Sequence, residues 1–317
     1  MKYVTKKSLL SVWKVASATF NGFLDDKGLK LSASLAYYTV FSIAPLLILL
    51  ISLASFFYGQ DAIQGKVFSQ VNAFVGNQAA AQIQSMIKSV SLSGKTGVAV
   101  VTGIITLILG ASGVFLEIQE SLNIIWRVKA KPKRGWVKMI TNRLLSFSLI
   151  IGLGFLLIVS LIINGVIIAL SDHLTHYFPN ATLLVLNVIN LGLTFIVISA
   201  LFGIIFKFLP DVNISWKEVR MGAFFTALLF MLGKYLIGIY ITTTGTGSTY
   251  GAAGSLIVIL VWIYYTSAIL YFGAEFTQVY AEFTGCKIQP AEYAVAVIQK
   301  EVEKEVATLP PQNPDLK

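Results

Sequence analysis

Long apolar stretches separated by short polar segments dominate the pattern of this chain. Residues 31–58 contain no charged side chain, and a helix of that length exceeds the roughly 30 Å hydrocarbon core of a bilayer. Further apolar stretches along the chain are also long enough to cross. The pattern predicts an all-α integral membrane domain over residues 31–280, with six transmembrane helices at 31–58, 97–118, 144–170, 183–206, 222–241 and 255–278.

Amphipathic segments surround these predicted spans. In residues 1–30, apolar positions such as Trp13 and Phe20 follow helical spacing beside lysines, a pattern typical of a helix lying on an anionic membrane face. Between the first two spans, residues 61–95 favour two short amphipathic helices over the outer mouth of the bundle. We therefore expect interfacial helices in addition to the six spans.

The segment 281–317 is predicted to lie outside the membrane. Val295, Ile298, Val302 and Val306 fall on one helical stripe, which predicts a cytoplasmic helix over 291–309. The last residues are polar and proline-rich, so we expect a disordered tail.

Composition agrees with a membrane protein. The chain of 317 residues is 56% hydrophobic and 12% charged, with a mean hydropathy of +0.77, whereas an average soluble domain has roughly 25% charged residues. A soluble globular protein is therefore excluded. Cys286 has no second cysteine to pair with, and His173 and His176 are the chain's two histidines. We expect no disulfide, metal site or cofactor.

The distribution of positive charge predicts the orientation. The net charge is +9, and the segment from Arg127 to Arg143, between the second and third predicted spans, is densely basic without a single acid. Such loops stay in the cytoplasm. With six spans, both termini then also lie in the cytoplasm. This orienting role accounts for the basic loop, so we expect no nucleic acid partner. The basic residues of that loop are Arg127, Lys129, Lys131, Lys133, Arg134, Lys138 and Arg143.

Lys234 is the main candidate for a substrate contact. An ammonium group within a membrane helix costs at least about 2.5–3.5 kcal/mol on insertion scales, and it usually faces a cavity or a partner. One interpretation is an outward-facing polar cavity in which Lys234 meets a lipid phosphate or a carboxylate. The alternative is that Lys234 snorkels to the outer interface or pairs with a carbonyl of the glycine-rich loop 242–254.

Glutamates near the inner ends of two spans are candidates for an ion path. Glu117 and Glu120 share a helical face with Asn123 one turn later, and Glu275 lies near the inner end of the last span. They favour either coordination of a proton or a cation, or an ordinary ion-pair network with the basic loop.

Signals for catalysis are weak. Phosphate-binding loops and GxSxG motifs are absent from the sequence, and one HxxH pair is too small a ligand set for a metal hydrolase. Tyrosines such as Tyr240 and Tyr250 supply hydroxyls that either line a polar path or form interfacial belts. We therefore expect a protein that is not an enzyme.

Four ordered motifs resemble the YihY/BrkB family of bacterial inner-membrane proteins. They are ASLAYYTVFSIAPLL (33–47), GASGVFLEIQESLNIIWRVK (110–129), ISWKEVRMGAFFTALLFMLGKYLIGIYI (214–241) and STYGAAGSLIVILVWIYYTSAILYFGAEF (248–276). The likeness covers roughly residues 10–285. It implies a multi-pass, six-span protein of the bacterial cytoplasmic membrane, often described as a transporter without a settled substrate. The family's former label of ribonuclease BN is regarded as a misannotation. The motif positions include Tyr37, Pro45, Asn123, Trp126, Lys234, Tyr240, Tyr250, Gly251 and Glu275.

Together these observations lead to a functional hypothesis with two rivals. We expect a transporter or lipid-handling protein that contacts membrane lipids and moves an amphiphilic or anionic substrate. Its candidate substrate-binding residues are Lys234, Tyr37, Pro45, Tyr240 and Tyr250. One rival is a cation or proton antiporter that uses Glu117, Glu120, Asn123 and Glu275. The other is an envelope structural or assembly factor that transports nothing.

Overall fold

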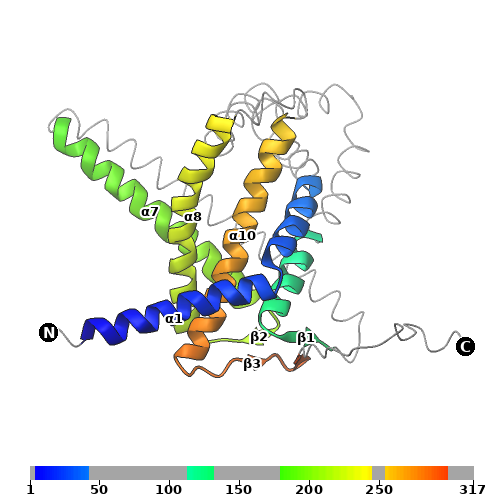
Figure 1. Ribbon diagram of the computed structural model, residues 1–317. Coiled ribbons are helices and arrows are strands. Elements are labelled where there is room, and N and C mark those ends of the chain that lie inside the picture. The colour runs from blue at the N-terminus through cyan, green and yellow to red at the C-terminus, as the bar shows by residue number, and fades with distance from the viewer. Residues whose placement is uncertain (1–3, 43–112, 132–178, 245–253, 299–317) are drawn as a thin grey trace, which may run out of the picture.

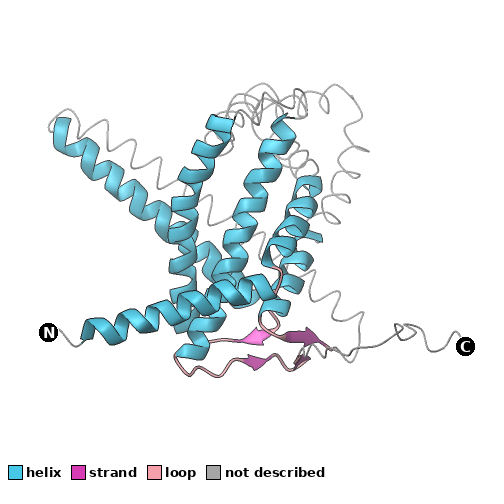
Figure 2. Cartoon of the chain, viewed as in Figure 1, coloured by secondary structure: helices cyan, strands magenta, loops and turns pink. Residues whose placement is uncertain are grey.

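The computed structural model describes residues 4–42, 113–131, 179–244 and 254–298 of the chain, and within them the fold is mostly helical (Figure 1). Within the described ranges, short strands appear at one end only (Figure 2). The helices are α1 (Val4–Asp25), a helix over 28–42, a helix over 113–125, α7 (Pro179–Phe208), α8 (Trp216–Thr244) and α10 (Gly254–Phe283).

Three of these helices are long and apolar enough to cross a membrane. The qualifying stretches are Leu191–Phe208, Trp216–Tyr240 and Leu256–Phe283, and only 28–33% of each is buried. The remainder of each stretch is available to lipid or to further spans. These helices confirm membrane-length elements at three predicted positions. Parts of the predicted spans 31–58 and 97–118, and all of 144–170, lie outside the described residues, as does the segment 61–95.

Helices α8 and α10 form an antiparallel pair that approaches closely through glycine. A Cβ on Gly222 would collide with the side chain of Thr277, and a Cβ on Gly273 would collide with that of Thr226. Each threonine hydroxyl donates to a carbonyl of its own helix, Thr226 to Gly222 and Thr277 to Gly273, both at 2.7 Å. The hydroxyls are therefore satisfied while the helices pack. In lipid, such small-residue contacts decide which helices associate, because burial of apolar surface drives association weakly there.

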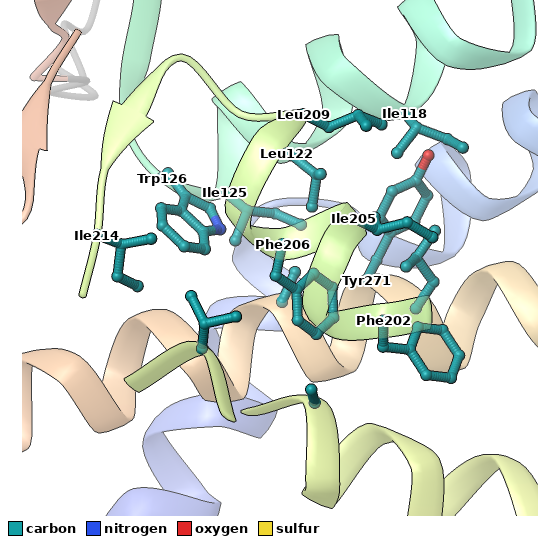
Figure 3. Packing of buried hydrophobic residues seen from close by; sticks show 14 of the residues in the cluster. Ile118, Leu122, Ile125, Trp126, Phe202, Ile205, Phe206, Leu209, Ile214 and Tyr271 are labelled. Atoms are coloured by element: carbon teal, nitrogen blue, oxygen red, sulfur yellow. The ribbon is translucent and has the colours of Figure 1, made fainter. Parts of the chain in front are cut away.

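The apolar core lies where the 113–125 helix meets α7 and α10 (Figure 3). Leu122, Phe206 and Tyr271, one from each helix, are completely buried. Phe202 stacks near Phe206 with ring centroids 6.1 Å apart. This core fixes the 113–125 helix against the membrane-length helices.

Two short antiparallel ribbons close one end of the bundle, at the bottom of Figure 1. In the first, β1 (Val128–Ala130) pairs with β4 (Ala294–Ala296). In the second, β2 (Val212–Asn213) pairs with β3 (Gln289–Pro290). We call this region, together with the adjoining ends of α1 and α10, the strand end.

The predicted helix over 291–309 is wrong in its first part. Residues 294–296 form β4, and Lys131 N–H donates to the carbonyl of Tyr293 at 2.7 Å beside it. The valine-rich sequence is compatible with either structure, and backbone pairing with β1 decides between them. Residues 299–317, where the rest of that helix and the tail were predicted, lie outside the described residues.

Helix α1 confirms the predicted amphipathic helix at the N-terminal side and crosses α10 (Figure 1). Val15 and Phe23 are buried, whereas Trp13 is 73% exposed. The helix ends at Asp25, and Lys27, in the turn that follows, has a φ of 56° that breaks the helical path. Gly28 follows, and a Cβ there would strike the ring of Phe23. The chain then turns directly into the 28–42 helix.

The described part of the first predicted span buries one side of its helix and exposes the other. Tyr38 and Phe41 are exposed, whereas Leu35 and Ala36 are buried. The buried side contains small and aliphatic residues, so the helix packs closely there, and its aromatic residues lie on the opposite side.

We predict that Gly222→Val and Gly273→Val each destabilise the protein by about 1–3 kcal/mol, the usual cost of overpacking. The added side chain would displace a threonine that is itself held by its own helix. Thermal unfolding in detergent would measure the effect. The control is Gly238→Ala in the same helix, where a Cβ meets nothing within 4 Å. Equal loss in all three variants would contradict the packing argument.

Candidate functional site at the strand end

Asp211 joins separate segments of the chain at the strand end. Asn123 donates from Nδ2 to Oδ2 of Asp211 at 2.9 Å, and the N–H of Asp211 donates back to Asn123 Oδ1 at 2.8 Å. Gln119 Nε2 donates to Oδ1 at 3.0 Å. The carbonyl of Asp211 accepts from the N–H of Ala291 at 3.0 Å. This link between α7 and α8 therefore holds both the 113–125 helix and the C-terminal segment.

Asp26 and Arg127 form an ion pair across a hundred residues of sequence. Arg127 Nη2 lies 2.7 Å from Oδ1 of Asp26, whose side chain is 3% exposed, whereas that of Arg127 is 41% exposed. Arg127 ends the 113–125 helix region with a φ of 54°, and its carbonyl accepts from Val297 N–H at 2.8 Å. The pair therefore links α1 to β1 and, through Arg127, to the C-terminal segment.

Burial raises the pKa of Asp26 above its ordinary value, since removing a carboxylate from water disfavours its charged form. Arg127 opposes this shift by attraction, and Asp25 adds to it by repulsion. The folded state therefore binds the proton of Asp26 more tightly than the unfolded chain does. Its contribution to stability is favourable at low pH and is lost as the pH rises through the raised pKa.

Glu275, on α10, lies close enough to this pair to interact electrostatically with both of its members. It is 4% exposed, and its Oε1 occupies the place that a Cβ on Gly22 would need. Its Oε2 has no hydrogen-bond partner in the described part of the chain. A buried carboxylate with an unpaired oxygen can accept a proton or a cation.

Two grooves open at the strand end around Arg127. The smaller, about 400 Å³, is lined by Glu120, Asn123 and Lys129 together with apolar residues. The larger, about 810 Å³, is lined by Asp26, Glu282 and others. Both are within the size range of small-molecule sites.

The structure separates the predicted ion-path residues into two groups. Glu120 and Asn123 line the smaller groove, and Glu117 is half-buried on the same helix. Glu275 lies with Asp26 instead. Both polar atoms of the Asn123 side chain form hydrogen bonds with Asp211, so its observed contacts are structural.

The predicted substrate-binding residues are not gathered into one described site. Lys234 lies on the exposed side of α8 and lines neither groove. Tyr37 and Tyr240 are 59% and 50% exposed, on different helices. Pro45 and Tyr250 lie outside the described residues.

Asp26 and Asp211 are missing from the residues predicted by sequence. Asp211 follows a proline in a short link between two apolar stretches, which makes it one of the few acids near a membrane helix end. That signal could have selected it. Asp26 stands next to Asp25 in a polar segment, and only the fold shows which of the two is buried.

The described residues contain no group of three or more histidine, cysteine, aspartate or glutamate side chains placed to hold a metal ion. The charged groups that line the two grooves at the strand end are individual carboxylates, the Arg127 guanidinium and the Lys129 ammonium. Such groups bind ions, ammonium groups and protons.

We predict unequal effects for the two members of the ion pair. Arg127→Met should leave Asp26 buried without its counter-ion, at a cost somewhat below the roughly 3–5 kcal/mol of fully buried pairs because Arg127 is partly exposed. Asp26→Asn should cost less, since it also removes the desolvated charge. The difference in thermal stability should narrow as the pH falls through the raised pKa of Asp26. Identical losses at every pH would contradict this account.

Comparison with known proteins gives the family. The sequence model described as Virulence factor BrkB matches residues 19–294. A UPF0761 membrane protein of Pseudomonas paraeruginosa is 30% identical over 260 residues, which cover 80% of this chain and 59% of the relative. A UPF0761 membrane protein of Tolumonas auensis is 28% identical over 268 residues, covering 80% of each chain.

The shared region has defined limits. It spans about three fifths of the Pseudomonas relatives' own length. No solved structure matches the chain. The family match includes the strand end as far as the first residue of β4, so this region is part of the family's common sequence and extends beyond the expected limit near residue 285. The chain belongs to the YihY/BrkB family of membrane proteins.

Proposed function

We propose that the protein is a transporter or lipid-handling protein that moves an amphiphilic or anionic substrate across the bacterial cytoplasmic membrane. The observation that carries this proposal is the position of Lys234. It lies within the membrane-length stretch Trp216–Tyr240, on an exposed side of α8, with exposed Leu232 and Leu236 nearby. An ammonium at that position attracts anionic groups that approach the exposed side of the helix.

The depth of Lys234 suits contact with an anionic head group. It lies six residues before Tyr240, or about 9 Å by the helical rise of 1.5 Å per residue. A lysine side chain can extend over much of that distance toward the interface. An amphiphile that crosses beside α8 would thus find a cation for its phosphate or carboxylate and apolar side chains for its tail. The strand end, with its basic loop, would face the cytoplasm.

We predict that Lys234→Met lowers the transport of an anionic fluorescent lipid analogue in proteoliposomes about tenfold or more, equivalent to about 1.4 kcal/mol. Lys234→Arg, which keeps the charge, should retain most of the rate. Lys217→Met is the matched control, because it removes an exposed lysine from the beginning of the same helix. Full activity of Lys234→Met would refute the proposal.

A second candidate function is exchange coupled to protons or cations. Glu275 favours it, because a carboxylate that is 4% exposed in a membrane-length helix keeps one oxygen without a described partner. Binding and release of an ion at that oxygen would change the charge between α1 and α10. Glu117 and Glu120 would guide ions along the neighbouring helix.

We predict that Glu275→Gln abolishes ion-driven flux while the protein remains folded, since glutamine keeps the shape of the side chain but cannot ionise. Flux would be followed in proteoliposomes with an imposed pH or sodium gradient. Glu292→Gln is the control, because it removes an exposed acid from the C-terminal segment. Unchanged flux in Glu275→Gln would remove this candidate. Partner binding without any flux in the unmodified protein would instead favour an envelope assembly factor.

A further inference from the structure

Buried polar atoms without partners concentrate where α1, α10 and the 113–125 helix meet. Six buried side-chain nitrogen or oxygen atoms have no hydrogen-bond partner in the described part of the chain, and four of them are oxygens of Asp26, Ser121, Tyr271 and Glu275. These four residues are only 0–7% exposed. Buried polar atoms in folded proteins nearly always bind a protein group or an ordered water. The four oxygens therefore indicate a polar site inside the protein.

Asp26 and Glu275 are neighbours at the crossing of α1 and α10. Oε1 of Glu275 occupies the place of a Cβ on Gly22. Asp26 lies one turn farther on the same face, and its N–H donates to the carbonyl of Gly22 at 2.9 Å. Asp26 pairs through Oδ1 with Arg127, so each carboxylate keeps one oxygen, Oδ2 or Oε2, in the interior without a described partner. The charged groups that act on Glu275 are Asp25, Asp26, Arg127 and Glu282.

Tyr271 continues this arrangement one helical turn farther from the strand end. Residues four apart share a helix face, so its side chain leaves α10 on the same side as that of Glu275, about 6 Å along the axis. Its hydroxyl points toward the 113–125 helix (Figure 3). There it adjoins Ser121, without a hydrogen bond of standard geometry, and lies within electrostatic range of Glu117. Ser121 and the half-buried Glu117 are again one turn apart on their own helix.

The chemistry of these groups selects water and protons as their ligands. Hydroxyls and protonated carboxyls can each donate and accept a hydrogen bond. Neither of the two grooves is lined by Ser121, Tyr271 or Glu275, so a ligand that reaches their oxygens must be small. The described residues also provide no set of three metal-ligating side chains.

We propose that these oxygens, with the waters they bind, form a proton-conducting row from Asp26 to Glu117. A proton taken up at Asp26 passes to Glu275, and then crosses the hydroxyls of Tyr271 and Ser121 to reach Glu117. Each hydroxyl receives a proton on its oxygen as it releases its own. One proton thus enters and one leaves, and every group returns to its original protonation state. The row rests on the proton-coupled exchange proposed for Glu275 and assigns the path of the proton.

The first test measures proton movement by the full-length protein in proteoliposomes that enclose the pH-sensitive dye pyranine. A sodium gradient, and then a potassium diffusion potential set with valinomycin, drives the movement. Tyr271→Phe removes one hydroxyl and keeps the ring in the core. We expect it to lower the initial rate about tenfold or more, and Ser121→Ala to do the same. Tyr265→Phe is the matched control, because this hydroxyl of the same helix lies against Gly233 of α8, and it should leave the rate unchanged.

Combining the two variants shows whether the hydroxyls act in series. In a single row, the first substitution already interrupts the path, so the double variant should keep about the rate of the slower single variant. Losses that multiply would assign separate roles to the two hydroxyls and overturn the row. Thermal unfolding in detergent accompanies each rate. Both substitutions remove a buried oxygen without adding atoms, so each protein should unfold close to the temperature of the unmodified one.

The outcomes separate this inference from the function on which it rests. Loss of proton movement in Glu275→Gln, together with full rates in Tyr271→Phe and Ser121→Ala, would overturn the row and leave the proton-coupled function standing. Absence of proton movement by the unmodified protein under both driving forces would overturn both.

Discussion

The hydrogen bonds around Asp211 are the constraint on which the rest of the strand end depends. One buried residue receives two side-chain donors from the 113–125 helix and returns a backbone donor to it. Its own carbonyl meanwhile holds the C-terminal segment. Loss of this residue would remove the Asp211 acceptor from the buried Asn123 amide and from the half-buried Gln119 amide. The cost of unpaired buried polar groups therefore fixes how these segments meet.

Polar contacts determine how these segments pack, because burial of apolar surface does little to select one helix partner over another in a membrane. A leucine-lined helix face has a similar free energy against lipid tails and against another helix, because both surroundings are apolar. The helices that do approach closely, α8 and α10, use glycine opposite threonine. At the strand end, the Asp26–Arg127 pair and the two ribbons fix the remaining segments. Specific geometry thus comes from a few small or polar residues within a largely apolar sequence.

The sequence predicted the features that follow from local energetics. Hydropathy located α7, α8 and α10, because placing charge in hydrocarbon is costly and the uncharged stretches are therefore informative. Helical spacing also located α1. The YihY/BrkB resemblance was confirmed by the family match. Membrane crossing by six spans stays a prediction.

Features that depend on distant pairing were missed. Sequence spacing does not reveal that Asp26 meets Arg127, or that residues 294–296 pair with β1 instead of continuing a helix. Asn123 was selected for an ion path, yet its partner is Asp211, almost ninety residues away. Because such distant contacts cannot be read from sequence, the pattern of the sequence selected Lys234 as the main candidate residue. The grooves of the described structure lie around Arg127 instead.

The close seating of Gly22 on Glu275 has a mechanical consequence. At this crossing α1 and α10 have no room for a side chain, so neither helix can roll against the other without separating. A thinner bilayer would increase the tilt of α10, and α1 would move with it as a rigid body. Its exposed Trp13 would then sink deeper or lift away.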